Sequence, residues 1–242
     1  MTEIPSLAPI YTLSVVDDAA RSPREAACSA ARDGADAGEF LWAARDDRFE
    51  CAVVLRPEEN AGAAEQVLFV TAMALIEALG ATVPPGIDAD IVWPGRLRVN
   101  GGFAGGASLD SAPVEGGGPP AWLVASVWIR IAAEDDREGG ERAATTSLRE
   151  EGCPDSTATS LAESFGRSFL SWMDRWQHNG FEPVRAAWMY WATVHGPDAV
   201  LTRGDELLAG RIEGLEDSGA LVLKTSAGMR TVPLTPADAA AD

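Results

Sequence analysis

The stretch that decides the fold lies near the middle of the chain and reads Val92-Trp93-Pro94-Gly95-Arg96-Leu97-Arg98-Val99-Asn100-Gly101-Gly102-Phe103-Ala104-Gly105-Gly106. Asn-Gly between two strand-like runs is a strong hairpin signal, because both residues accept the positive φ angles of a tight turn. Pro-Gly a few residues earlier marks another turn. We therefore predict short strands over 90–93, 97–99 and 103–109.

Helices and further strands are predicted on both sides of this hairpin. Ser22-Pro23-Arg24-Glu25 predicts a helix start, since Ser22 can accept a hydrogen bond from the third amide and Glu25 can reach back. A helix over 63–79 is apolar on nearly every face, which is typical of a core helix. Apolar residues at spacings of three and four predict a long helix over 160–178. Strands are predicted over 11–16, 39–44, 50–56 and 122–131.

The end of the chain has a different character. Three short strand-like runs, over 206–215, 219–225 and 229–234, are separated by turn-forming residues. The fold class predicted is therefore α+β, with a mixed or antiparallel sheet packed against helices over 1–197 and a small SH3-like β-barrel over 200–236.

The charge of the chain excludes one class of partner. There are 37 Asp+Glu against 19 Lys+Arg, giving a formal charge of −18 in 242 residues. Nucleic-acid binding needs clustered cations that replace counterions on phosphates, so we expect no nucleic-acid partner. The longest apolar run, over 67–76, is too short to cross a bilayer, and the N-terminus lacks a secretory signal, so we expect a cytoplasmic protein with no membrane partner.

The three cysteines, Cys28, Cys51 and Cys153, lie far apart and form no C-x-x-C pair. They predict small buried hydrophobes, with neither a disulfide framework nor a thiolate metal site. Adjacent carboxylates such as Asp46-Asp47 lack further spaced ligands, so no metal site is expected.

In the order of its parts the chain resembles the biotin/lipoate protein ligase family. The segment from Val92 to Gly101, followed by Gly105-Gly106, resembles the family's K-W-P-N-D segment, its hairpin and its A-G element. The run 122–131 stands where the family has a G-x-G-x-N strand. Further similarity lies in Glu25-Ala26-Ala27 before Gly34, in 51–57, in 146–152, and in Gly210 to Gly214 with Gly219 to Leu221, which resembles the C-terminal barrel of biotin ligases.

The resemblance implies a known chemistry, in which biotin or lipoate attacks ATP to form an acyl-adenylate and a lysine of a carrier protein then displaces AMP. ATP and Mg²⁺ enter as cofactors by this resemblance only. The chain departs from the family where that chemistry resides. Val92 replaces the motif lysine, Gly95 and Arg96 replace Asn and Asp, Phe103 replaces a second basic residue, and the Arg/Gly-rich loop before Cys51 is missing.

Losing one preorganised donor commonly costs about 10²–10³ in rate. We therefore identify the chain as a divergent member of the family that lacks the catalytic lysine, a possible pseudoenzyme, and assign no catalytic residue. The candidate ligand cleft lies between the hairpin region and strand 122–131, with eight candidate residues: Arg45, Arg48, Trp93, Arg96, Gly105, Gly106, Trp128 and Arg130.

Each candidate has a structural alternative. Trp128 and Arg130 lie two apart on one strand face, where they can bind a ring and an anion, or fill the pocket and pair with an acid. Arg96 and Arg98 can form a positive rim or weak surface ion pairs. Arg45 and Arg48 can contact a ligand, or belong to a turn of self-complementary charges with Asp46 and Asp47.

Three functions remain open at this point. The first is a protein that keeps a cleft for a small biotin-, lipoyl- or adenylate-like anion without standard ligation. The second is an active ligase or acyltransferase with rebuilt catalytic residues and a different acyl donor. The third is a non-catalytic module that docks a carrier protein. The sequence leaves the ligand, the carrier, the pathway and the choice between monomer and homodimer undetermined.

Overall fold

A computed structural model of the chain describes residues 3–17, 21–114, 116–133, 145–203, 206–235 and 238. Its larger part is built on a seven-stranded sheet in the order β1-β2-β3-β7-β6-β5-β4. β1 pairs with β2 in parallel and the other neighbours are antiparallel, so the predicted mixed sheet is confirmed. The strands are β1 (Thr12–Val16), β2 (Glu39–Ala43), β3 (Arg48–Leu55), β4 (Ala89–Val92), β5 (Arg96–Val99), β6 (Gly102–Ser111) and β7 (Leu123–Arg130).

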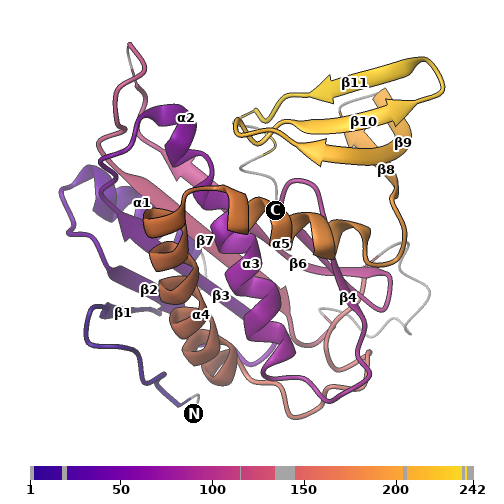
Figure 1. Cartoon of the computed structure of the whole chain (residues 1–242). Coiled ribbons are helices and arrows are strands. Elements are labelled where there is room, and N and C mark those ends of the chain that lie inside the picture. Colours follow the sequence, from indigo (N-terminus) through magenta and orange to yellow (C-terminus); the bar gives the residue numbers. More distant parts are fainter. Residues whose placement is uncertain are drawn as a thin grey trace.

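Helices cover the two faces of this sheet unequally. Figure 1 shows α3 (Val67–Gly80) and α4 (Ala158–Asn179) side by side on one face, where they form the main core with alternate residues of the strands. The short α1 (Pro23–Arg32) packs on the other face, against β2, β3 and β7. Because side chains alternate along a strand, the face of β7 that carries Val124 under α1 also carries Ser126, Trp128 and Arg130.

The start of α1 follows the predicted pattern. The Ser22 hydroxyl accepts from the Glu25 amide at 3.2 Å, and the Glu25 carboxylate accepts from the Ser22 amide at 3.0 Å. Pro23 occupies the first turn of the helix. The capping box read from the sequence is therefore present, and it fixes where α1 enters the open face of the sheet.

The apolar segment predicted over 63–79 is divided in two. A short α2 (Ala61–Ala64) leads into α3 through bonds that span three residues, from the Gln66 amide to Ala63 O and from the Leu68 amide to Glu65 O. In α3 all residues except Glu77 and Gly80 are buried. Among the described residues, only 61–80 is long and apolar enough for a membrane span, but 72% of that window is buried inside the protein, as in a core helix.

The C-terminal residues form a separate antiparallel sheet in the order β11-β10-β9-β8. Its strands are β8 (Asp198–Arg203), β9 (Glu206–Leu215), β10 (Leu221–Thr225) and β11 (Gly228–Val232). β8 was not predicted, because Gly196-Pro197 reads as a boundary and the strand is only six residues long. The small antiparallel β unit is confirmed, whereas its closure into an SH3-like barrel and the domain limits 1–197 and 200–236 stay predictions.

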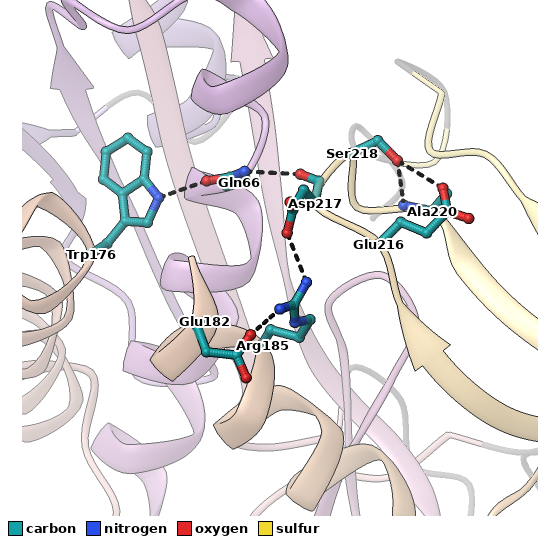
Figure 2. A network of polar contacts seen from close by, with 8 residues as sticks. All are labelled: Gln66, Trp176, Glu182, Arg185, Glu216, Asp217, Ser218 and Ala220. Atoms are coloured by element: carbon teal, nitrogen blue, oxygen red, sulfur yellow. Dashed lines mark hydrogen bonds and ion pairs between the residues drawn. The ribbon is translucent and has the colours of Figure 1, made fainter. Parts of the chain in front are cut away.

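A polar network joins this small sheet to the helices (Figure 2). Gln66 accepts from Trp176 Nε1 of α4 at 2.8 Å and donates to the carbonyl of Asp217 at 2.8 Å. Arg185, on α5 (Glu182–Thr193), donates to the Asp217 carboxylate at 2.7 Å and also pairs with Glu182. The β9–β10 turn is therefore bound to three helices.

Hydrogen bonds and one apolar contact, between Gly219 and Phe69, hold the same turn against the core. Trp93 Nε1 donates to the Gly219 carbonyl at 3.0 Å, and Trp188 Nε1 donates to the Pro94 carbonyl at 3.0 Å. Gly219 has φ +76°, and a Cβ added to it would lie 2.7 Å from Cε2 of Phe69. Only glycine fits this position, because both its backbone conformation and the space above it exclude a side chain.

The remaining predicted elements agree in type with the structure. Helix 160–178 corresponds to α4, and the strand predictions shift by one or two residues at their ends. The acidic stretch 134–144 lies outside the described residues. Next to it, Leu148 is fully buried, and its amide donates to Arg130 O at 3.0 Å, so the segment 146–150 packs against the end of β7.

Candidate ligand cleft

The open face of the sheet carries a small polar pocket at the start of α1. Its lining includes Ser22 and Arg24 from the helix start, Ser108 from β6, and Ser126 from β7. The pocket has a volume of about 30 Å³, which is room for a water molecule and too little for a bicyclic ligand. The Ser126 hydroxyl is buried and has no hydrogen-bond partner among the described residues, so the floor of the pocket offers an unused polar group.

Trp128 closes this pocket. The guanidinium of Arg48, on β3, lies 4.3 Å from the centroid of its indole, and that of Arg130 lies 5.4 Å from it. Arg48 Nε is also 2.6 Å from Oε1 of Glu50, which pairs with Trp128 across the β3–β7 ladder. Two of the predicted site residues, Arg48 and Trp128, thus meet in a cation–π stack, which favours the packed conformation of the indole.

The two candidate glycines let the strands approach each other beneath Trp128. A Cβ on Gly105 would lie 2.3 Å from Trp128 O. Gly106 is the ladder partner of Trp128, and a Cβ there would lie 3.7 Å from the indole Nε1. Gly105 is therefore required by the packing of β6 on β7, whereas a Cβ at Gly106 would make contacts of ordinary van der Waals length.

A larger cavity lies beside the first, between the sheet and the C-terminal unit. It has a volume of about 350 Å³ and is lined by Val92, Trp93, Arg96 and Phe103 on one side and by residues of β8, β9 and β11 on the other. Asp238 also borders it, and the carboxylate of Asp238 accepts a hydrogen bond from the Thr235 amide at 2.9 Å. Leu201, Leu208 and Val232 supply the second wall. Volumes in this range are typical of small-molecule sites.

Arg96 is the cationic group of the larger cavity. Its guanidinium carbon lies 3.6 Å from the centroid of the Phe103 ring. The loss of water around the guanidinium lowers the pKa of Arg96 from its ordinary value, which still leaves it charged at neutral pH. Within the described part of the chain, Arg96 has no carboxylate partner.

Arg130 contacts the backbone of Phe103. It donates to the carbonyls of Phe103 and Thr146 at 3.4 Å each, which are long bonds, and the described ranges give it no carboxylate partner. Arg96 and Arg130 thus both contact Phe103, and the described part of the chain gives neither of them a carboxylate partner.

Other arginines are already neutralised. Arg98 binds Asp90 through two bonds of 2.7 and 2.9 Å, and Arg45 binds Asp47 at 2.6 Å in the β2–β3 turn. The Arg45 guanidinium holds the pKa of the Asp47 carboxyl below its ordinary value, mainly through the hydrogen bond between them. Arg98 therefore forms an ion pair, although with a buried carboxylate and not at the surface as the alternative had it. Arg45 is paired within its own turn, as in the alternative of self-complementary charges.

Several cleft residues were missed by sequence reasoning. The positions of Ser126 and Glu50 at the small pocket follow only from the β3–β7 register. The residues that β8 contributes to the larger cavity were not identified, because that strand was not predicted. A period-two reading of β7 was the one available signal for Ser126, since it shares a face with Trp128.

Magnesium fits poorly at the cleft. Mg²⁺ needs several oxygen ligands, usually carboxylates and phosphates, whereas the motif positions hold Gly95 and Arg96. The described residues contain no group of three or more His, Cys, Asp or Glu arranged to hold a metal ion.

Comparison with known proteins places this architecture in one family. Residues 7–190 match the biotin/lipoate A/B protein ligase family, and residues 199–233 match the biotin protein ligase C-terminal domain. The chain is 33% identical over 199 residues to a biotin–[acetyl-CoA-carboxylase] ligase of Paracoccus denitrificans, covering 79% of this chain and 80% of that one.

Solved structures agree. A biotin protein ligase-like protein of unknown function from Silicibacter sp. superposes with a TM-score of 0.83 at 29% identity, covering 95% of this chain and 96% of that one. Biotin protein ligase from Aquifex aeolicus in complex with biotin and ATP gives 0.67 at 15% identity, covering 92% and 95%, and shares the fold. The chain therefore belongs to the biotin/lipoate A/B protein ligase family.

Proposed function

We propose that this protein binds a small biotin-, lipoyl- or adenylate-like anion in its cleft and does not carry out standard ATP-dependent ligation. The observation that carries the proposal is Arg96, whose guanidinium stacks on the Phe103 ring at the wall of the larger cavity, with Arg130 bonded to the backbone carbonyl of the same phenylalanine. A chain with a charge of −18 in which Arg96 borders a 350 Å³ cavity and has no carboxylate partner among the described residues is arranged to receive an anion there.

The absence of standard ligation is inferred from what the cleft residues can supply. Acyl-adenylate formation brings two anions together and needs cations placed at the carboxylate and the phosphates. Val92 and Phe103 carry no charge at the two lysine-like positions, and the residues present do not suit Mg²⁺. Trp128 also leaves only about 30 Å³ at the start of α1, so a bicyclic acid would require the indole to move.

A second candidate function is an active ligase or acyltransferase with rebuilt catalytic residues. Arg96 favours it, because its guanidinium enters the same cavity as Val92 and Phe103 and places a positive charge near the positions that lost theirs. The name of the Paracoccus relative supports this candidate as well. A guanidinium keeps its proton and offers planar bidentate donors, so it can bind a phosphate without acting as a base.

Titration calorimetry and a turnover assay separate these candidates. We expect AMP, biotin or lipoate to bind, and Arg96→Ala and Arg130→Ala to weaken that binding at least tenfold. The control is Arg45→Ala, because Arg45 is an exposed arginine paired within its own turn. Pyrophosphate release from ATP and Mg²⁺ should stay at background with biotin or lipoate.

The two possible failures have different meanings. Acid-dependent pyrophosphate release would refute the absence of ligation and establish the second candidate. Failure of all these anions to bind the wild-type protein would refute the anion cleft and favour the third function, carrier-protein docking. We place the protein in the cytoplasm, as a monomer or homodimer, on the sequence argument alone.

A further inference from the structure

A second sizeable cavity lies away from the cleft, on the helix-covered side of the sheet. It has a volume of about 430 Å³ and sits between the second half of α4, the end of β3 and the segment before β1. Val53 and Leu55 of β3 line it with their core-facing side chains, whereas the cleft residues of β3, Arg48 and Glu50, point to the opposite face. The sheet therefore separates the two sites.

The outer wall of this cavity is a built structure. The Tyr11 hydroxyl donates to Gly166 O of α4 at 3.0 Å, and its ring packs edge-on against Phe40 with centroids 5.2 Å apart. Gly38 continues the wall, where φ is +90° and a Cβ would lie 2.6 Å from Ile10 O. The Gly38 amide donates to Val54 O and its carbonyl accepts from the Thr12 amide. The wall is thus hydrogen-bonded to both the sheet and α4.

The interior of the cavity is apolar. Aliphatic and aromatic side chains from four elements face it: Val53, Leu55, Val67, Leu123, Phe169, Leu170 and Met173. Phe169 stacks on Phe165 with centroids 5.4 Å apart, which fixes its ring at the back of the cavity. The buried ring of Phe169 and the partly buried thioether of Met173 suit an aromatic or short aliphatic body.

The polar end of the cavity accepts hydrogen bonds. Glu58 and Glu59 lie at the rim with the amide of Gln177, and no described residue pairs with the Glu58 carboxylate. Arg56 also borders the cavity, but its guanidinium already donates to the carbonyls of Ala31, Ala35 and Ala121. Arg56 keeps its positive charge, but its N–H groups are directed at these carbonyls. Two carboxylates against one guanidinium leave the rim net negative, which complements an ammonium group.

We propose that this cavity is a second small-molecule site, separate from the family cleft, which binds a primary amine carrying an apolar body of ring or short-chain type. The apolar body lies against Phe169 and Met173, and the ammonium is bound at Glu58 and Glu59. A carboxylate head on the same body meets the two rim carboxylates and is rejected.

Three probes with one apolar body test the proposal: 4-phenylbutylamine, 4-phenylbutanol and 4-phenylbutyrate. Their dissociation constants are measured by calorimetry and by ligand-observed NMR at physiological salt, because a chain with a charge of −18 attracts any cation at low salt. We expect saturable binding of the amine, at least tenfold tighter than the alcohol and with no measurable binding of the carboxylate.

Variants locate the site. Glu58→Gln/Glu59→Gln should bring the amine down to the affinity of the alcohol, with Glu77→Gln, an exposed carboxylate on α3, as the matched control. Met173→Trp, or Ala37→Trp at the exposed rim if the first variant folds poorly, should abolish binding of both amine and alcohol. Equal affinity for amine and carboxylate, unchanged binding in the filled variants, or no binding at all would each overturn the proposal.

Discussion

Replacing Gly219 by alanine should destabilise the contact between the C-terminal sheet and the core, and so lower the free energy of unfolding. The residue has φ +76°, and its new Cβ would lie 2.7 Å from the Phe69 ring and 3.2 Å from Leu234. A left-handed conformation costs an L-residue about 1–2 kcal/mol. Overpacking a closed contact adds about 1–3 kcal/mol, because the Phe69 ring is buried and braced by Phe181 and Trp188. The free energy of unfolding should therefore fall by roughly 2–5 kcal/mol.

The matched control is Gly117→Ala. Gly117 has the same φ, +76°, in an exposed loop, and its added Cβ would meet nothing within 4 Å. The two variants share the backbone cost, so the difference between them isolates the steric contact and should be about 1–3 kcal/mol. Urea unfolding followed by tryptophan fluorescence measures both, since Trp93 donates to the Gly219 carbonyl. Equal destabilisation of the two variants would refute the reasoning, because the contact with Phe69 would then contribute nothing.

Three further outcomes follow from other contacts. The Glu25→Gln substitution should weaken the capping box at the start of α1. The hydrogen bond from the Ser22 amide lowers the pKa of Glu25. The ionised carboxylate therefore stabilises the fold above about pH 4.5, and this stabilisation disappears as the pH falls through the lowered pKa. Chemical unfolding should show a larger difference from wild type at about pH 7 than at about pH 3. A double-mutant cycle on the bidentate Arg24–Asp110 pair, which is about a quarter exposed, should give a coupling near 1 kcal/mol, and a value of zero would contradict the observed geometry. Burial raises the pKa of Cys28 to about 11, so its alkylation rate in the folded protein should keep rising tenfold per pH unit from pH 8 to 10, and a plateau near pH 9 would contradict this.

The fold could be predicted well from local signals. The capping box at Ser22 and the Asn100-Gly101 hairpin both have short-range physical causes, and the structure confirms both elements. The break between α2 and α3 was not predictable from the same kind of reasoning, because the segment is apolar throughout and the 3₁₀ turn at 65–66 leaves no mark in the periodicity. β8 was missed for a related reason, since a six-residue strand next to Gly-Pro gives a weak signal.

The cleft could be predicted only in part. The family resemblance placed Trp128, Arg96 and Phe103 in one region, whereas the structure places Trp128 at the small pocket and Arg96 with Phe103 at the larger cavity. Which arginine finds a carboxylate depends on the pairing of neighbouring strands. Arg98 finds Asp90 across the β4–β5 ladder, whereas Arg96 pairs with Val92 and stacks on a ring, and the sequence alone does not distinguish these two neighbours.

The way in which the β9–β10 turn is seated has a consequence for hybrid proteins. Its partners, Gln66, Phe69, Trp93 and Arg185, come from three elements of the larger part and are scattered over more than a hundred positions of the chain. A chimera can be made by joining this chain at residue 197, between the two sheets, to the last strands of a relative. The β9–β10 turn of the relative would then not match the four residues that hold this turn. Successful exchange requires these four positions to travel with the transplanted sheet.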